Sequence, residues 1–87
     1  MTDKVRGSTF YAYIVQCKYG TYYAGWTNDL KKRIAAHNNG TGAKYLRGKG
    51  PVNLVYKRKF SSVQKAQAQE RKIKKFTRKE KEVLIRK

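Results

Sequence analysis

Residues 11–37 read YAYIVQCKYGTYYAGWTNDLKKRIAAH, and this stretch decides the fold. Residues 10–17 and 21–26 are rich in β-branched and aromatic side chains, which favour strands. Residues 18–20, KYG, have the length of a hairpin loop, and glycine suits the left-handed backbone that such a loop requires. The sequence therefore predicts that the fold begins with an antiparallel hairpin.

The loop length also predicts the register of this hairpin. Residue numbers of antiparallel partners add to a constant, so Val15 is expected to pair with Tyr23 and Tyr13 with Gly25. Residues two apart on a strand share a face, which places the side chains of Tyr13 and Tyr23 on one side of the sheet. A two-residue loop would place these two side chains on opposite faces.

A helix is expected next, through about residue 38. Its apolar stripe comes from three residues: Leu30, Ile34 and Ala35. Thr27 or Asn28 can cap its N-terminus, and Asp29 is favourable in its first turn because the helix dipole attracts negative charge there.

One more strand and further helices complete the predicted fold. Residues 52–60 alternate enough for a half-buried strand. Ser61 or Ser62 then caps a long helix that is broken or bent near Thr77, and residues 78–87 continue it as a basic helical tail. The order strand, strand, helix, strand, helix, helix (β-β-α-β-α-α) predicts an α+β fold with helices packed against a three-stranded sheet.

Length and charge limit the functions that the protein can have. A chain of 87 residues suits one domain, expected over residues 9–87 after a flexible N-terminus at residues 1–8. Its 22 Lys and Arg against 5 Asp and Glu give a formal net charge of +17, for which nucleic acid is the natural partner. The chain lacks both a signal-peptide pattern and an apolar run of ~20 residues, so we expect no membrane association and a cytoplasmic location.

Cysteine and histidine each occur once, as Cys17 and His37. A single cysteine cannot form an intramolecular disulfide, and one residue of each kind cannot assemble a zinc site. Cys17 ends an alternating apolar run, so it is expected to be a small buried side chain rather than a reactive thiol.

Glu70 is the most informative acid. It follows Ala66 by four positions and precedes Ile73 by three, so it lies on the apolar face of its helix. A carboxylate there must be paired with Lys or Arg, protonated, or bound to a cation. The other acids are explained by the loose terminus, a helix start or the charged tail: Asp3, Asp29, Glu80 and Glu82. Glu70 is thus the candidate ligand of one water-rich Mg²⁺ ion.

Arg33 and His37 are four positions apart and share one side of their helix. Arg33 could stabilise negative charge on a phosphate, or belong to a solvated basic face. His37 could work beside it in a common cleft, or contact carbonyl groups at the helix end. The tyrosines of the hairpin could pack the sheet or supply hydroxyls that position or deprotonate water: Tyr11, Tyr13, Tyr22 and Tyr23.

A glycine-flanked basic loop follows this helix. Lys44, Arg47 and Lys49 could follow a phosphate backbone while the ring of Tyr45 meets a base, which predicts binding of nucleic acid without sequence readout. Charge runs of this kind also occur in ordinary solvated loops.

These residues occur in an order that resembles the GIY-YIG nuclease domain, in particular its small stand-alone bacterial branch. The first motif reads Ala12-Tyr13-Ile14, with alanine at the position of the glycine, and the second reads Tyr23-Ala24-Gly25. Arg33, His37 and Glu70 fall where the family has its arginine, a histidine or tyrosine, and its metal-binding glutamate. The stretch Gly42-Ala43-Lys44-Tyr45 resembles one typical of the small branch.

The resemblance implies a three-stranded antiparallel sheet flanked by helices, and a DNA endonuclease that uses one Mg²⁺ or Mn²⁺. Glu70 would hold the cation and Arg33 would stabilise the transition state. Tyr13 would activate water with help from Tyr23 and His37. With no room for a separate targeting domain, low sequence specificity, a role in DNA repair or recombination, and a protein partner for targeting are expected.

Two other hypotheses stay open. The protein could bind DNA or RNA without cutting it, since charge alone supports binding. It could also be a structural protein of the ribosome or nucleoid that uses residues 71–87 as its contact surface.

Overall fold

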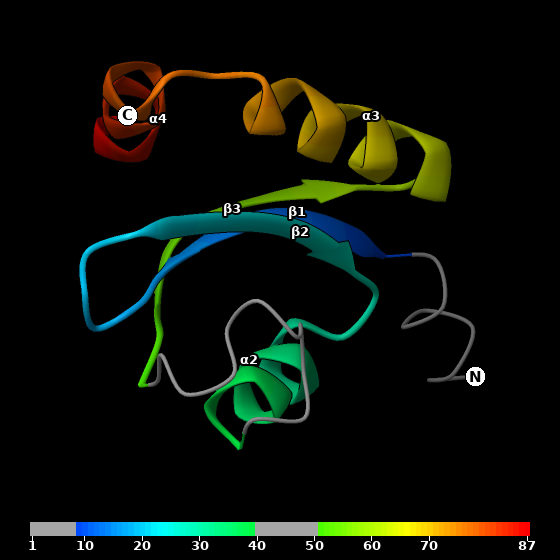
Figure 1. The fold of residues 1–87 in the computed structure, drawn as a ribbon. Helices are drawn as coiled ribbons and strands as arrows, with labels where there is room; N and C mark the ends of the chain where they lie inside the picture. The colour runs from blue at the N-terminus through cyan, green and yellow to red at the C-terminus, as the bar shows by residue number, and fades with distance from the viewer. Residues whose placement is uncertain (1–8, 40–50) are drawn as a thin grey trace.

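The computed structural model describes residues 9–39 and 51–87 of the chain. Its sheet has three antiparallel strands, β1 (Phe10–Gln16), β2 (Tyr22–Thr27) and β3 (Asn53–Phe60). Their order is β2-β1-β3, so the first strand is central and both of its edges are paired (Figure 1). The predicted α+β fold and its element order are confirmed.

The hairpin between β1 and β2 has the expected three-residue loop. The Cys17 N–H donates to the Thr21 carbonyl at 2.9 Å, and the Gly20 N–H donates to the Cys17 carbonyl at 2.8 Å. Gly20 has a φ of +89°, which favours glycine. Tyr13 lies opposite Gly25, so the predicted register is confirmed.

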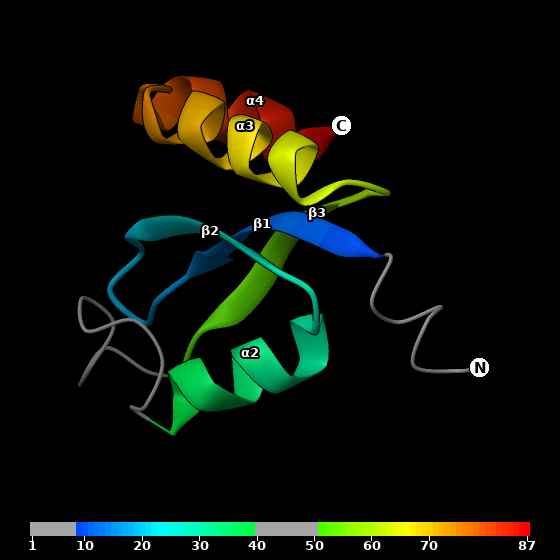
Figure 2. The ribbon, with the colours of Figure 1, turned by 90° about the vertical axis from the view of Figure 1, so that its right-hand side faces the viewer.

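The helices cover both faces of the sheet. Helix α2 (Leu30–Asn38) lies on one face, while α3 (Val63–Lys74) and α4 (Arg78–Arg86) lie on the other (Figures 1 and 2). None of the helices in the described ranges is long and apolar enough to cross a membrane.

Two buried clusters correspond to these two faces. The cluster on the α2 side contains four buried residues: Tyr13, Val15, Cys17 and Val52. The cluster on the α3 and α4 side contains three: Ile14, Ala24 and Ile73. The alternation of β1 thus feeds both cores, as expected for a central strand with helices on both sides. Cys17 is buried as predicted.

Helix α2 differs from its prediction in two details. Its N-cap is Asp29, whose Oδ1 accepts from the Lys32 N–H at 3.1 Å, and not Thr27 or Asn28. Thr27 is still the last residue of β2. Ala35 is exposed, and the buried position of the inner stripe is taken by His37, three residues after Ile34. The helical phase therefore places a histidine where an apolar side chain was expected.

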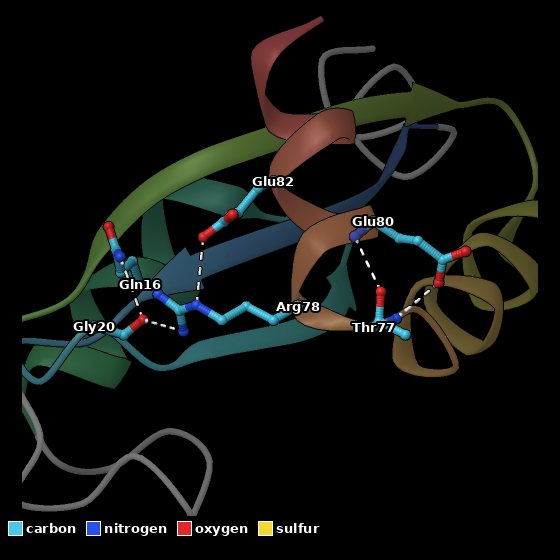
Figure 3. Close-up of polar contacts among 6 residues, drawn as sticks. All are labelled: Gln16, Gly20, Thr77, Arg78, Glu80 and Glu82. Atoms are coloured by element: carbon cyan, nitrogen blue, oxygen red, sulfur yellow. Dashed lines mark hydrogen bonds and ion pairs between the residues drawn. The ribbon is translucent and has the colours of Figure 1, made fainter.

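The predicted break near Thr77 separates α3 from α4. Thr77 begins α4 with a capping box: its hydroxyl accepts from the Glu80 N–H at 3.2 Å, and its own N–H donates to Glu80 Oε1 at 2.8 Å (Figure 3). Ser62 caps α3 by accepting from the Lys65 N–H at 3.3 Å. The final basic segment is helical, as predicted.

Arg78 ties the start of α4 to the first hairpin. Its Nη1 donates to the Gly20 carbonyl at 3.0 Å (Figure 3). Its guanidinium lies 4.7 Å from the centre of the Tyr22 ring. Gln16 donates to the same carbonyl at 3.3 Å, and Glu82 pairs with Arg78 at 3.3 Å. These contacts fix α4 against the hairpin loop, 58 positions away in sequence.

Candidate active site

A buried polar pair forms the centre of the candidate site. The Tyr13 hydroxyl lies 2.9 Å from Nε2 of His37, and the two residues are only 1% and 2% exposed. Tyr13 comes from the central strand and His37 from the last turn of α2. The hydrogen bond thus joins His37 to the central strand.

Gly25 makes room for this pair. A Cβ atom added at Gly25 would lie 2.5 Å from the Tyr13 hydroxyl oxygen and 2.7 Å from its Cζ. Such distances are far inside van der Waals contact, so the Tyr13 ring can lie across its neighbouring strand only where that strand has a glycine. Glycine is required at position 25 because the Tyr13 ring approaches the backbone closely there.

Tyr23 completes an aromatic arrangement around His37. The Tyr23 ring meets the imidazole edge-on at a centroid distance of 5.8 Å, and the Tyr13 ring lies at 6.0 Å. These contacts restrict the rotation of the imidazole. The structure therefore confirms that Tyr13 and Tyr23 share the face that α2 covers.

Burial shifts the pKa values of both members of the pair. It raises the pKa of Tyr13 to about 12, with smaller upward contributions from Tyr23 and Glu70 and a downward one from Arg33. Burial, followed by the positive charge of Arg33, lowers the pKa of His37. Both groups are neutral at neutral pH, so the phenol can donate its proton to an unprotonated imidazole nitrogen.

Arg33 lies on the exposed side of α2, next to the buried pair. Its guanidinium is exposed to solvent, yet its charge acts on both the phenol and the imidazole. A permanently charged group in this position can stabilise negative charge that develops on a bound phosphate.

Glu70 is largely buried, and it makes the salt bridge that was its alternative explanation. Its side chain is 17% exposed, and Oε2 lies 3.1 Å from Nζ of Lys74. The Lys74 side chain is 52% exposed, so this pair is weak and its cation can leave. A single carboxylate fits one divalent ion that keeps most of its waters.

The acid reaches the site from the opposite side of the sheet. Glu70 belongs to α3, whereas Tyr13 and Tyr23 face α2. Lys74 connects the two sides, because its Nζ pairs with Glu70 and also lies 5.9 Å from the centre of the Tyr23 ring. The candidate site is therefore arranged around β2, an edge strand of the sheet.

The other described acids have structural partners. Asp29 caps α2, Glu80 belongs to the capping box of α4, and Glu82 pairs with Arg78. Within residues 9–39 and 51–87, no three His, Cys, Asp or Glu side chains cluster closely enough to hold a metal ion together. A cation at Glu70 would thus take its remaining ligands from water and from a bound phosphate.

Four of the predicted site residues cannot be placed. Lys44, Tyr45, Arg47 and Lys49 lie outside the described residues.

Two residues of the site were missed at the level of sequence. Gly25 was expected opposite Tyr13, but its close approach to the ring follows only from the side-chain direction. Lys74 lies four positions after Glu70, a spacing that predicts a helical ion pair and could have identified it.

Comparison with known proteins finds relatives over most of the chain. The model of the GIY-YIG catalytic domain matches residues 9–83. The UPF0213 protein CPE1444 of Clostridium perfringens is 57% identical over 75 residues, which are 86% of this chain and 81% of that protein. The UPF0213 protein YazA of Bacillus subtilis is 48% identical over 73 residues, which are 84% of this chain and 74% of that protein.

Solved structures show the same fold. The solution NMR structure of the UPF0213 protein BH0048 from Bacillus halodurans aligns with a TM-score of 0.58 at 43% identity, over 88% of this chain and 82% of that one. The solution NMR structure of the protein EF2693 from E. faecalis aligns with a TM-score of 0.61 at 38% identity, over 90% of this chain and 83% of that one.

Proposed function

Because the chain belongs to the GIY-YIG catalytic domain family, a nuclease-type domain, we propose that it is a metal-dependent endonuclease that hydrolyses DNA phosphodiester bonds. The observation that carries this proposal is the buried hydrogen bond between Tyr13 and His37 beside Arg33. A phenol joined to a neutral imidazole is a proton path, and a nearby guanidinium suits a phosphate.

The pair would activate the attacking water. The Tyr13 oxygen takes a proton from water as its own proton passes to His37 Nε2, so no free phenolate is needed despite the raised pKa of Tyr13. The water oxygen bonds to phosphorus, one P–O bond breaks, and the departing oxygen takes a proton from solvent. Tyr23 keeps the imidazole oriented for this transfer.

Arg33 and Glu70 would stabilise the charge on the phosphate. Arg33 pairs with the oxygens that become more negative in the transition state. Glu70 would hold one Mg²⁺ or Mn²⁺ ion, which supplies Lewis-acid stabilisation when bound. Lys74, released from Glu70, is left free to contact the strand.

The substrate would be selected by backbone contacts rather than by base sequence. The net charge of +17 attracts phosphates irrespective of the bases. Low sequence specificity suits repair or recombination, in which DNA structure or damage marks the place to be cut, and a protein partner would then direct the enzyme. Lys44, Tyr45, Arg47 and Lys49 remain proposed strand contacts.

The test compares cleavage of nicked, branched and single-stranded DNA by the wild type, Tyr13→Phe and Arg33→Ala. Each substitution should lower the rate in Mg²⁺ or Mn²⁺ by about 100-fold or more. Tyr19→Phe, in the exposed hairpin loop, and Lys32→Ala, next to Arg33, are the matched controls and should cut normally. Equal residual cutting by all five proteins would identify a contaminant and reject the proposal.

A nucleic-acid-binding protein without catalysis is the second candidate. The ion pair between Glu70 and Lys74 favours this second function. Glu70 is the carboxylate that we propose as the metal ligand, and in the structure it is already paired with a lysine. Tight binding whose salt slope is about −0.9 per phosphate contact, with no metal-stimulated cutting of any substrate, would support this function instead.

A further inference from the structure

A cavity lies on the α2 side of the sheet, between β1, β3 and the start of α2. It has a volume of about 640 Å³, within the range of small-molecule binding sites. Its walls are mainly aromatic and aliphatic, and they come from β1, α2 and β3: Tyr11, Leu30, Ile34 and Leu54. Leu54 is 37% exposed, so part of this apolar wall is in contact with solvent.

The cavity and the proposed catalytic residues share their supporting elements. Tyr11 precedes Tyr13 by two positions on β1, so both side chains lie on the same face of the strand. Lys57, which lines the cavity, is the β3 partner of Tyr13 in the sheet. Ile34 directly follows Arg33 on α2. The cavity lies toward β3, whereas the candidate site is arranged around β2, so a molecule in the cavity would lie on the same face of the sheet as Tyr13 but outside the candidate site itself.

The charges around the cavity indicate what it binds. Lys31 and Lys57 are exposed residues of its lining, and neither has an ion pair within the described residues. Asp29 also lines it, but its carboxylate oxygen accepts from the N-terminus of α2. An apolar, aromatic cavity flanked by ammonium groups suits a flat ring attached to phosphate, as in a nucleotide. An uncharged apolar ligand would make no use of the two lysines.

We infer that this cavity holds a nucleobase of the bound DNA strand. The inference rests on the proposed nuclease function and adds to it a defined subsite. The base lies against the Tyr11 ring and the aliphatic wall, while Lys57 and Lys31 contact the phosphates on either side of it. Stacking on a tyrosine is tolerant of base identity, so the subsite positions the strand without strong sequence preference.

The first test fills the cavity and measures binding of a short fluorescent oligothymidylate in EDTA, where no metal-dependent cutting occurs. Leu54→Trp places a large ring at the partly exposed wall and should weaken binding about tenfold. Val83→Trp is the matched control, because Val83 is 52% exposed on α4 and lies outside the cavity. Amide NMR spectra verify that both variants are folded. Equal affinities of the two folded variants would overturn the inference.

The second test locates the base directly and needs no variant. Thymidine 5′-monophosphate should shift the methyl NMR signals of Leu30, Ile34 and Leu54, whereas deoxyribose 5-phosphate, which lacks the base, should leave them nearly unchanged. Shifts confined to lysine signals, or identical shifts with both probes, would reject the subsite.

These outcomes separate the subsite from the nuclease proposal. Base-dependent methyl shifts in a protein that never cuts DNA would keep the subsite and remove the nuclease function. Tyr13-dependent cutting with no base-dependent shifts would keep the nuclease and remove the subsite.

Discussion

The Tyr13 hydroxyl and the His37 imidazole lie 2.9 Å apart, although 24 positions separate the two residues. The contact forms only if the Tyr13 side chain points from β1 toward α2 and the His37 side chain points from α2 toward the sheet. Replacing two buried hydrogen-bonded partners by apolar side chains of the same shape costs little stability. Packing alone therefore gives no reason for a polar pair here, whereas the proposed proton transfer gives one.

Gly25→Ala tests whether the Tyr13 ring needs the space above β2. The added Cβ would overlap the ring, which must then move away from its hydrogen-bonding position. We expect a loss of about 1–3 kcal/mol in the free energy of unfolding, with a large loss of cutting. Urea unfolding and a cleavage assay measure both.

The control for Gly25→Ala is the same substitution combined with Tyr13→Ala. Removal of the ring should relieve most of the overlap, so Gly25→Ala should cost much less in that background. An equal cost with and without the ring would show that the two residues do not interact.

The stability of the fold should depend on the ionisation of Tyr13. Burial raises its pKa to about 12 in the folded protein, above the ordinary value near 10. The protonated phenol therefore contributes fully below about pH 10, and this contribution is lost as the pH rises toward 12. Relative to Tyr13→Phe, the wild type should lose ~2 kcal/mol of unfolding free energy over that range.

Urea titrations followed by Trp26 fluorescence measure this pH dependence. Tyr19→Phe is the control, because Tyr19 is 71% exposed and should keep the wild-type profile. His37 gives an acid counterpart: its lowered pKa means that its contribution is present above about pH 6.5 and is lost as the pH falls through the folded value. Parallel profiles for the wild type and Tyr13→Phe would contradict the assigned burial of the phenol.

Lys74→Gln should tighten the binding of Mn²⁺. The ammonium group lies 3.1 Å from the Glu70 carboxylate and competes with a cation for it. Exposed pairs contribute little, so the expected gain in affinity is about two- to fivefold. Titration followed by water proton relaxation measures it, and Lys72→Gln, exposed on the same helix, is the control. Weaker binding by Lys74→Gln than by its control would show that the lysine does not compete.

Arg78→Ala should loosen α4 without affecting the chemistry. The guanidinium donates to the Gly20 carbonyl (Figure 3) and lies over the Tyr22 ring. Loss of both contacts should cost about 1–2 kcal/mol of unfolding free energy. Arg86→Ala, exposed near the end of the same helix, should cost less than ~0.5 kcal/mol. Urea unfolding of both variants measures these losses in stability, and equal losses would contradict the role of Arg78.

Local sequence rules predicted the elements and the register. The glycine-ended loop determined that Tyr13 faces Gly25, and the position of Glu70 among apolar helix residues indicated that its side chain turns inward. These features depend on the spacing of residues within one hairpin or one helix, and that spacing can be read from the sequence.

Contacts between distant elements could not be predicted from the residues alone. The sequence did not show that α2 and α3 cover opposite faces, because either helix can pack on either side of the sheet. It also did not show that His37 would meet Tyr13 rather than the end of its own helix. His37 follows Leu30 by seven positions and Ile34 by three, a spacing that places it on the same face of the helix. Assigning Ala35 to that face instead left the burial of His37 unpredicted.

The most direct test of the site as a whole is NMR with Mn²⁺, which broadens signals of nearby nuclei. We predict the strongest broadening at Glu70 and at the side chains of Tyr13, Tyr23 and His37, and loss of that pattern in Glu70→Gln but not in Glu82→Gln. Broadening centred on Asp29, Glu80 or Glu82, with those four side chains unaffected, would contradict it.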